Sequence, residues 1–147
     1  MKIALATDHA GFELKEHVKS ELIALGYNVQ DFGAHAYDAL DDYPDFICGA
    51  AKFVAENSDS KGIIFGGSGQ GEAMSANRFK KVRAAVFYGD SEELIKLSRL
   101  HNDANILSIG ARFVELSEIM NFIQLWLNTE FEGGRHKRRI EKLDIID

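Results

Sequence analysis

Short apolar runs separated by longer amphipathic stretches recur along the whole chain. Residues 2–7 form such a run, ending in polar side chains, and residues 62–65, 84–87 and 105–109 form three more. Runs of this length, bounded by polar residues and glycine, are typical of strands buried on both faces of a sheet. Residues 27–32 alternate between apolar and polar side chains, which predicts a fifth strand.

The stretches between these runs have the spacing of helices. Over residues 11–25 apolar side chains recur every three or four positions, and Gly26 follows as a helix-terminating glycine. Pro44 suits the first turn of a second helix that continues through Val54. Further helices are expected over residues 72–79, 91–100, 115–128 and 134–143.

Strands that alternate with helices predict an α/β fold with a mainly parallel sheet. Right-handed crossovers make this a Rossmann-like three-layer αβα sandwich with a five-stranded parallel sheet. The chain shows no linker or internal repeat, so residues 1–147 are expected to form a single domain. Ligands bind beyond the carboxyl ends of the strands in such sheets, so the polar residues after each strand are the first candidates for a site.

The composition excludes several classes of protein. With 46% hydrophobic residues the chain can bury a core, and a single cysteine, Cys48, rules out a disulfide framework. No apolar run approaches the roughly 20 residues that span a bilayer, and Asp8 comes too early for a signal peptide. A soluble, cytoplasmic protein without membrane contacts is expected.

The charge is unevenly distributed. A net charge of -6 argues against nucleic-acid binding, which requires a basic face. Residues 1–60 hold 4 Lys/Arg against 11 Asp/Glu, whereas residues 135–142 hold five Lys/Arg and one acid. This basic cluster is either a site for a small anion or a solvated helix face, and charge alone favours the solvated face.

The richest motif is the sequence Gly-Gly-Ser-Gly-Gln-Gly-Glu at residues 66–72. Four glycines let the backbone approach a ligand closely with its N–H groups pointing inward, as in an anion-binding nest. The motif lacks the lysine of a Walker A loop, and its spacing differs from the dinucleotide fingerprint. An ordinary turn needs only one or two glycines, so an anion or oxyanion site is favoured.

Glu72 stands at the start of the helix that follows this loop. One interpretation is a stabilising partner of the helix dipole. The other is a general base beside a set of oxyanion donors, the two components that proton abstraction next to a carbonyl requires.

Two histidines stand out by their positions. His9 follows Asp8 at the end of a buried strand, where core packing rarely calls for histidine. His101 precedes the fifth strand, where it either stabilises a helix C-terminus or acts in catalysis. Asp8, Asp103 or neither is its orienting partner.

Arg135 and Arg139 are four residues apart and share one face of a predicted helix. Two guanidinium groups on one face suit a phosphate, and His136 adds a possible donor. No spacing of His, Cys and carboxylates has a metal-ligand pattern, so neither a metal nor another cofactor is expected.

Together these motifs resemble one family along nearly the whole chain, the ribose-5-phosphate isomerase B / galactose-6-phosphate isomerase family. The matching segments are residues 7–12, 42–44, 66–72, 75–78, 101–105, 110–112 and 132–136. The resemblance implies an aldose–ketose isomerase that works through a cis-enediolate without a metal. It also implies a homodimer or homotetramer.

The same resemblance assigns roles to individual residues. Glu72 is the C–H base, as in the branch of the family whose glycine loop ends in glutamate, and His101 opens the sugar ring. The other branch uses a cysteine at the position of Gly66, and here the one thiol, Cys48, lies elsewhere. Ser68 joins the catalytic residues, because it holds the enediolate together with the amides of Gly67, Gly69, Gln70 and Gly71, and Asn102 binds nearby. The expected phosphate anchors are Arg112, Arg135 and Arg139, with His9 assisting. Asp8 and His9 also contact the substrate, and Tyr43 contacts the sugar.

The sequence leaves the substrate and the functional class open, and it makes one prediction about assembly. The substrate is ribose 5-phosphate or a six-carbon sugar phosphate such as allose 6-phosphate or galactose 6-phosphate. A phosphate-binding regulatory domain or a non-catalytic paralogue is the less favoured alternative, because no catalytic position is missing. The helix over residues 119–127 has more apolar side chains than a solvent-facing helix, which predicts packing on a partner subunit as well as on the sheet, and sites shared between subunits.

Overall fold

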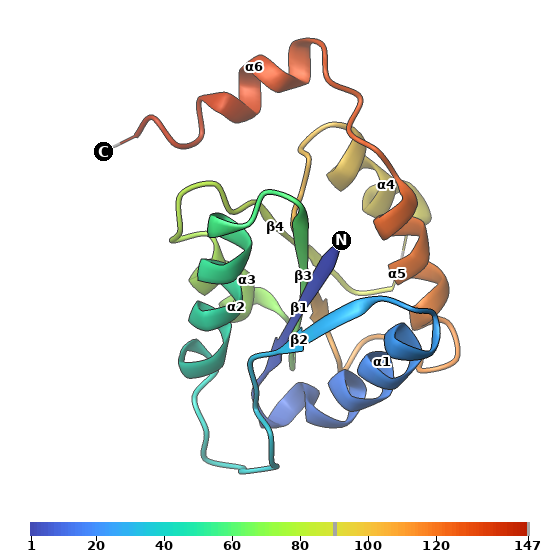
Figure 1. The fold of residues 1–147 in the computed structure, drawn as a ribbon. Coiled ribbons are helices and arrows are strands. Elements are labelled where there is room, and N and C mark those ends of the chain that lie inside the picture. Colours follow the sequence, from blue (N-terminus) through green and yellow to red (C-terminus); the bar gives the residue numbers. More distant parts are fainter. Residues whose placement is uncertain (90, 147) are drawn as a thin grey trace.

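The computed structural model describes residues 1–89 and 91–146, and its centre is a five-stranded parallel sheet (Figure 1). The strands are β1 (Lys2–Thr7), β2 (Asn28–Asp31), β3 (Ser60–Gly66), β4 (Ala84–Phe87) and β5 (Ile106–Gly110). Their order in the sheet is β2-β1-β3-β5-β4, so β2 and β4 are the outermost strands. All four pairings are parallel, as the alternation of strands and helices predicted.

The side chains of the central strands are buried on both faces of the sheet. In β1, Ile3 and Leu5 point to one helical layer, while Ala4 and Ala6 point to the other. Successive side chains of a strand alternate between faces, so a continuous apolar run can supply two cores. The three-layer αβα sandwich is therefore confirmed.

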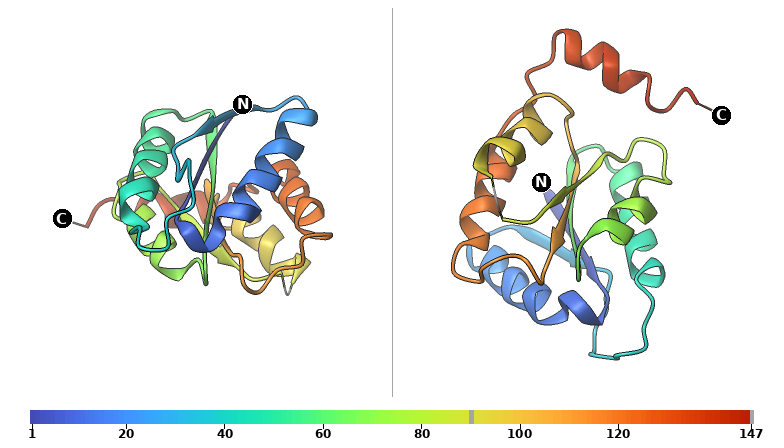
Figure 2. Two further views of the ribbon diagram at one scale, coloured as in Figure 1. Left: turned by 90° about the horizontal axis from the view of Figure 1, so that it is seen from below. Right: turned by 180° about the vertical axis from the view of Figure 1, so that it is seen from behind.

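Helices cover the sheet on both sides (Figure 2). The helices are α1 (Phe12–Ala24), α2 (Pro44–Glu56), α3 (Gln70–Ala76), α4 (Glu92–Leu100), α5 (Ile119–Asn128) and α6 (Arg135–Glu141). The buried side chains of α1, α4 and α5 join one core, and those of α2 and α3 join the other.

Two helices differ from their predicted bounds by three residues or more at one end. The third begins two residues early, because Gly69 in a left-handed conformation turns the chain into it. It ends at Ala76 because the Asn77 side chain pairs with both backbone groups of Ala84. The fifth begins only at Ile119, after turns.

The predicted excess of apolar surface on α5 is wrong. Ile119, Ile123, Trp126 and Leu127 are buried, and its other large apolar side chains pack against the same core. Because α5 lies beside α4 in the helical layer on this face of the sheet and turns its apolar side to the core, it presents no large exposed apolar side chain. Exposed apolar surface for a partner subunit must therefore come from other elements.

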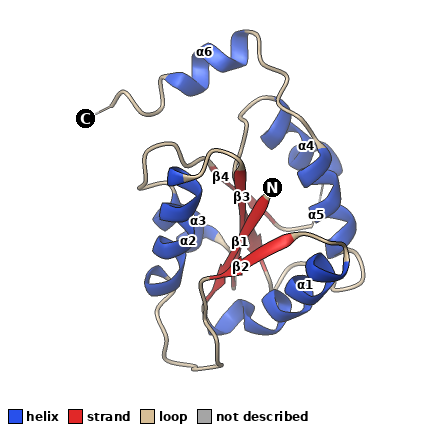
Figure 3. Ribbon diagram, in the orientation of Figure 1, coloured by secondary structure: helices blue, strands red, loops and turns tan. Residues whose placement is uncertain are grey.

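The two ends of the sheet carry different segments. Figure 3 shows the long loop between β2 and α2 at the bottom, where strands end, and α6 at the top, where strands begin. We call these ends the carboxyl edge and the amino edge. Among the described residues, no helix is both long and apolar enough to cross a lipid bilayer.

Candidate active site at the carboxyl edge of the sheet

The glycine-rich loop connects β3 to α3 and is held against the end of β5. The Ser108 hydroxyl donates a hydrogen bond to the carbonyl oxygen of Gly69 at 2.6 Å. Gly69 has φ of 77°, and a Cβ there would lie 3.1 Å from the Gly110 nitrogen. Only glycine fits both the conformation and the close approach, so this turn holds the amides of the loop at the carboxyl edge.

Glu72 lies in the first turn of α3 with only 4% of its surface exposed. Its carboxylate fills the space where a side chain on Gly66 would begin. Burial raises the pKa of the Glu72 carboxyl, and the charge of Asp8 raises it further. A buried carboxylate with a raised pKa is a stronger base than an exposed one once it is ionised.

Asp8 and His9 lie next to this loop, after β1. The Asp8 carboxylate accepts a hydrogen bond from the Ala10 amide at 2.9 Å and starts the short 3₁₀ turn His9–Gly11. Asp41 accepts two hydrogen bonds from His9, one from the main-chain N–H at 2.9 Å and one from Nδ1 at 2.7 Å. The hydrogen bond to Asp41 raises the pKa of the His9 imidazole. The cationic form of the ring is therefore favoured, and a cation suits an anionic ligand.

The side chains of Tyr43 and Arg112 pack against the glycine-rich loop. A Cβ on Gly71 would lie 2.6 Å from the Tyr43 ring, and one on Gly67 would lie 3.2 Å from the Arg112 guanidinium. The Gln70 side chain donates to the Tyr88 hydroxyl at 2.6 Å. The Ser68 hydroxyl accepts a hydrogen bond from the Gln70 amide at 3.3 Å.

The structure therefore gathers most predicted site residues at the carboxyl edge. These are Asp8, His9, Tyr43, Gly67, Ser68, Gly69, Gln70, Gly71, Glu72 and Arg112. Asp41, which holds His9, was missed by sequence reasoning, because it lies in an irregular loop with no periodicity to single it out.

The other predicted residues lie at the amino edge of the same chain. His101 caps the end of α4, Asn102 follows it, and the Asn102 carbonyl accepts a hydrogen bond from Arg83, just before β4. Arg135 and Arg139 lie on α6 and are exposed. The seven residues of β3 separate the two edges, about 20 Å at ~3.3 Å per residue. One chain alone does not bring these residues to Glu72.

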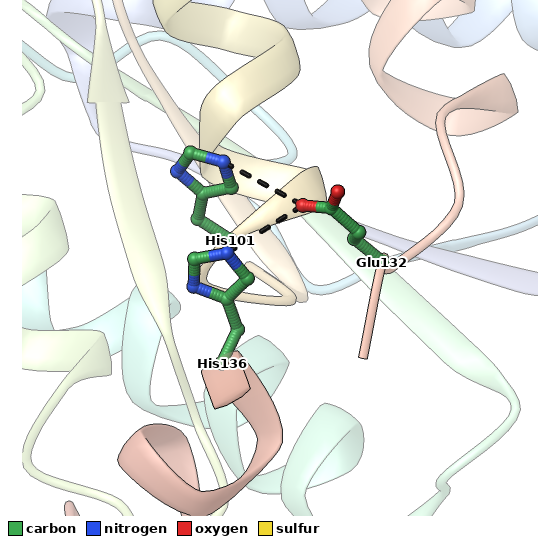
Figure 4. Close-up of side chains that lie close together, drawn as sticks. All are labelled: His101, Glu132 and His136. Carbon is green, nitrogen blue, oxygen red and sulfur yellow. Dashed lines mark ion pairs between the residues drawn. The ribbon is translucent and has the colours of Figure 1, made fainter. Parts of the chain in front are cut away.

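Neither Asp8 nor Asp103 orients His101. Asp8 is bound to the Ala10 amide, and Asp103 pairs with Arg83 and Arg99. His101 instead lies beside Glu132 and stacks on His136, as Figure 4 shows. Burial lowers the pKa of His136, and the nearby charges of His101 and Arg135 lower it further.

Comparison with known proteins identifies relatives along nearly the whole chain. The sequence profile of the Ribose/Galactose Isomerase family matches residues 3–143. The chain belongs to the ribose/galactose isomerase family.

Individual relatives of this family are similar in sequence and in fold. A probable ribose-5-phosphate isomerase B of Mycoplasma genitalium is 43% identical over 142 residues, 96% of this chain and 92% of that protein. The ribose-5-phosphate isomerase B of Escherichia coli is 36% identical over 146 residues, 99% of this chain and 96% of that protein. A crystal structure of the M. genitalium enzyme with bound ribulose 5-phosphate superposes with a TM-score of 0.92 at 42% identity, covering 98% of this chain and 94% of that one.

Proposed function

We propose that this chain is a ribose-5-phosphate isomerase that interconverts ribose 5-phosphate and ribulose 5-phosphate. Its similarity to isomerases of type B, one of which was crystallised with ribulose 5-phosphate, supports a five-carbon substrate over a six-carbon one. The observation that carries the chemistry is the buried Glu72 carboxylate beside the amides of the glycine-rich loop. A regulatory anion-binding domain would not need that carboxylate.

Glu72 is the base in this proposal. It removes the proton from C2 of the open-chain aldose, and the electron pair of that C–H bond forms the C1–C2 double bond of a cis-enediolate. The loop amides and the Ser68 hydroxyl stabilise the negative charge that develops on the oxygens. Return of the proton to C1, together with transfer of the C2 hydroxyl proton to O1, turns C2 into the carbonyl of the ketose, so no atom is gained or lost.

His101 and the arginines of α6 act on the site of a second copy of the chain. His101, Asn102, Arg135 and Arg139 lie a sheet length from Glu72 of their own chain, so a dimer is needed to bring them to the sugar phosphate. In Figure 1, α6 extends beyond the amino edge, where it is available to a neighbouring molecule. We infer that residues 1–147 form one isomerase domain whose segment 134–143 contributes to phosphate binding and subunit contacts.

The surface beside the edge strand β4 suits such a partner. Met74 on α3 is 64% exposed and Val86 on β4 is 38% exposed, and both line a groove together with Gln70 and Arg78. Because this groove adjoins the glycine-rich loop through Gln70, a second copy bound there would lie next to the substrate. A homodimer of this kind, or a homotetramer built from it, is the proposed assembly.

Within the shared site, each group has a definite task. His101 transfers the proton that opens the furanose ring, and Asn102 and Tyr43 contact the sugar, as does Asp8. Arg112 and His9 from one chain and Arg135 and Arg139 from the other bind the phosphate, because a dianion favours several cationic donors. A sugar phosphate does not cross membranes unaided, so the cytoplasm is the expected compartment.

The test of function is a substrate comparison. Purified full-length chain is assayed for conversion of ribose 5-phosphate, allose 6-phosphate and galactose 6-phosphate to their ketoses. The highest kcat/KM is expected for ribose 5-phosphate. Binding of all three without turnover would instead indicate a non-catalytic phosphate-binding protein.

A further inference from the structure

Three potential metal ligands from separate segments meet at the amino edge of the sheet. Figure 4 shows His101 at the end of α4, Glu132 in the connection before α6, and His136 in the first turn of α6, all pointing toward one another. One ligand atom of each lies within 4.8 Å of the other two. The sequence expectation of no metal could not detect this cluster, because His101 is far from the other two along the chain.

The distances are too long for hydrogen bonds but suit a shared ion. Glu132 Oε2 lies 3.7 Å from His101 Nε2 and 3.5 Å from His136 Nε2. In a tetrahedral zinc site with bonds of about 2.0–2.1 Å, any two ligand atoms lie about 3.3–3.4 Å apart. Shifts of a few tenths of an ångström would therefore bring Glu132 and each histidine to the separation that a common ion imposes.

The backbone holds the three segments together without the ion. The Glu132 amide donates to the carbonyl of Leu100 at 3.0 Å, which ties the connection to the turn that carries His101. His136 is 10% exposed at its side chain, whereas His101 is 40% exposed. The two imidazole rings stack with centroids 4.2 Å apart and 13° between planes, so the freer His101 ring must tilt to share an ion.

A second group of possible ligands, formed by Asp8, His9 and Asp41, is less suited to a metal. Asp41 Oδ1 already accepts two hydrogen bonds from His9, and Asp8 Oδ1 accepts one from Ala10. The three residues of the amino-edge cluster have no hydrogen bond between their side chains.

We propose that His101, Glu132 and His136 bind Zn²⁺ or a similar divalent transition metal ion, and that the bound ion inhibits the enzyme. Two imidazoles and one carboxylate favour zinc over the oxygen-seeking Mg²⁺ and Ca²⁺. Three protein ligands leave a fourth position for water. Binding occupies Nε2 of His101, the nitrogen that faces Glu132, so this nitrogen can no longer transfer a proton to the sugar.

The metal site and its consequence depend on different premises. Binding of the ion follows from the geometry of the three side chains alone. Inhibition rests on the proposed function, because it requires that His101 opens the sugar ring. The experiment therefore has one readout for each.

The first readout is the visible absorption of Co²⁺ added to the EDTA-treated full-length protein. Tetrahedral Co²⁺ absorbs much more strongly than the hydrated ion, so a saturable band is expected for the wild type. Glu132→Gln and His136→Asn should weaken Co²⁺ and Zn²⁺ binding at least about 10- to 100-fold, the loss that follows even from removing an outer-shell partner. Glu130→Gln and His35→Asn, at an exposed acid and an exposed histidine outside the cluster, are the matched controls and should bind like the wild type.

The second readout is isomerase activity with added Zn²⁺, expressed relative to the metal-free rate of each variant. The wild type should lose activity as the site fills and regain it with EDTA, and Glu132→Gln should need at least about tenfold more Zn²⁺ for the same loss. Equal Co²⁺ affinity in the wild type and both cluster variants would overturn the site. A saturated site with an unchanged rate would overturn the inhibition while leaving the isomerase function intact. A wild type without isomerase activity would overturn the proposed function and the inhibition with it, and the Co²⁺ absorption would still decide whether the metal site exists.

Discussion

At residue 72 a carboxylate is buried at the start of a helix, beside a strand end that carries no side chain. Replacing Glu72 with Gln keeps the shape and removes the base, so kcat should fall about 10²- to 10⁴-fold with little change in KM. Steady-state kinetics with ribose 5-phosphate measure both constants. Cys48→Ser is the control for a thiol mechanism, because the half-buried Cys48 lies on α2, and it should keep nearly full activity.

The raised pKa of Glu72 also makes a prediction about pH. Only the ionised carboxylate accepts a proton, so kcat/KM should rise as the pH increases through the raised pKa of Glu72. The acidic limb should therefore lie above the usual range of a glutamate, and Glu72→Gln should abolish it. An acidic limb that persists in Glu72→Gln would assign it to another group.

The raised pKa of Glu72 also means that its ionisation destabilises the folded protein. A carboxyl with a higher pKa in the folded than in the unfolded state binds its proton more tightly when folded, so its ionisation lowers the free energy of unfolding. The loss begins near the unfolded pKa and is complete above the folded pKa. Glu72→Gln should thus melt at a higher temperature than the wild type at neutral pH, with the difference shrinking toward pH 4, as thermal unfolding would measure.

At the scale of elements, the connection between β3 and α3 can hold the Glu72 carboxylate because Gly66 has no side chain in the space that the carboxylate occupies. A Cβ at Gly66 would overlap the Glu72 carboxylate, so Gly66→Ala must displace it. A misplacement of about 1 Å can reduce turnover about 10²-fold, which is the expected loss in kcat. Gly49→Ala is the matched control, because Gly49 lies in α2 and the nearest neighbour of an added Cβ is the Phe32 side chain. This variant should keep wild-type kinetics. Circular dichroism checks the fold of both variants.

The strands and helices could be predicted because their signals are local. The apolar run of β1 supplies both cores, and the spacing of Leu14, Val18 and Leu22 defines the buried face of α1. The end of α3 could not be predicted, since it depends on a pairing between Asn77 and Ala84. The excess of exposed apolar surface on α5 was predicted wrongly, because periodicity reports an apolar face but not which neighbour covers it.

The candidate site divides in the same way. Residues that follow strands, such as Asp8 and Arg112, could be placed at one edge of the sheet from topology alone. Asp41 and Glu132 could not be found, because each depends on a loop conformation that brings it to a histidine. The position of His101 at the opposite edge was visible in the sequence, but its meaning depends on how two chains pack.

At the scale of the whole molecule, the basic face of α6 should act on the phosphate bound by a second copy. Arg139→Ala removes a charge-assisted hydrogen bond and should raise KM for ribose 5-phosphate roughly 10- to 100-fold with the fold intact. Arg138→Ala removes the same charge from the adjacent position, which points to a different side of the helix, and should change KM little. Equal effects of the two substitutions would indicate a general attraction by charge and no specific anchor.

The strongest test of a shared site is complementation between two inactive variants. In a symmetric dimer whose sites combine Glu72 of one chain with His101 of the other, Glu72→Gln and His101→Asn are each inactive in both sites. A hybrid of the two collects both substitutions in one site and leaves the other site intact. Equal co-expression yields half hybrids, so the mixture should regain about a quarter of the wild-type activity.

A matched pair distinguishes this from simple stabilisation by mixing. Glu72→Gln and Arg112→Ala both lie at the carboxyl edge, so in their hybrid each site carries one of the two substitutions. Co-expression of that pair should restore no activity at subsaturating ribose 5-phosphate. If the first pair also restores none, although sedimentation shows hybrid dimers, then Glu72 and His101 do not serve a common site, and the ring-opening role of His101 must be abandoned with it.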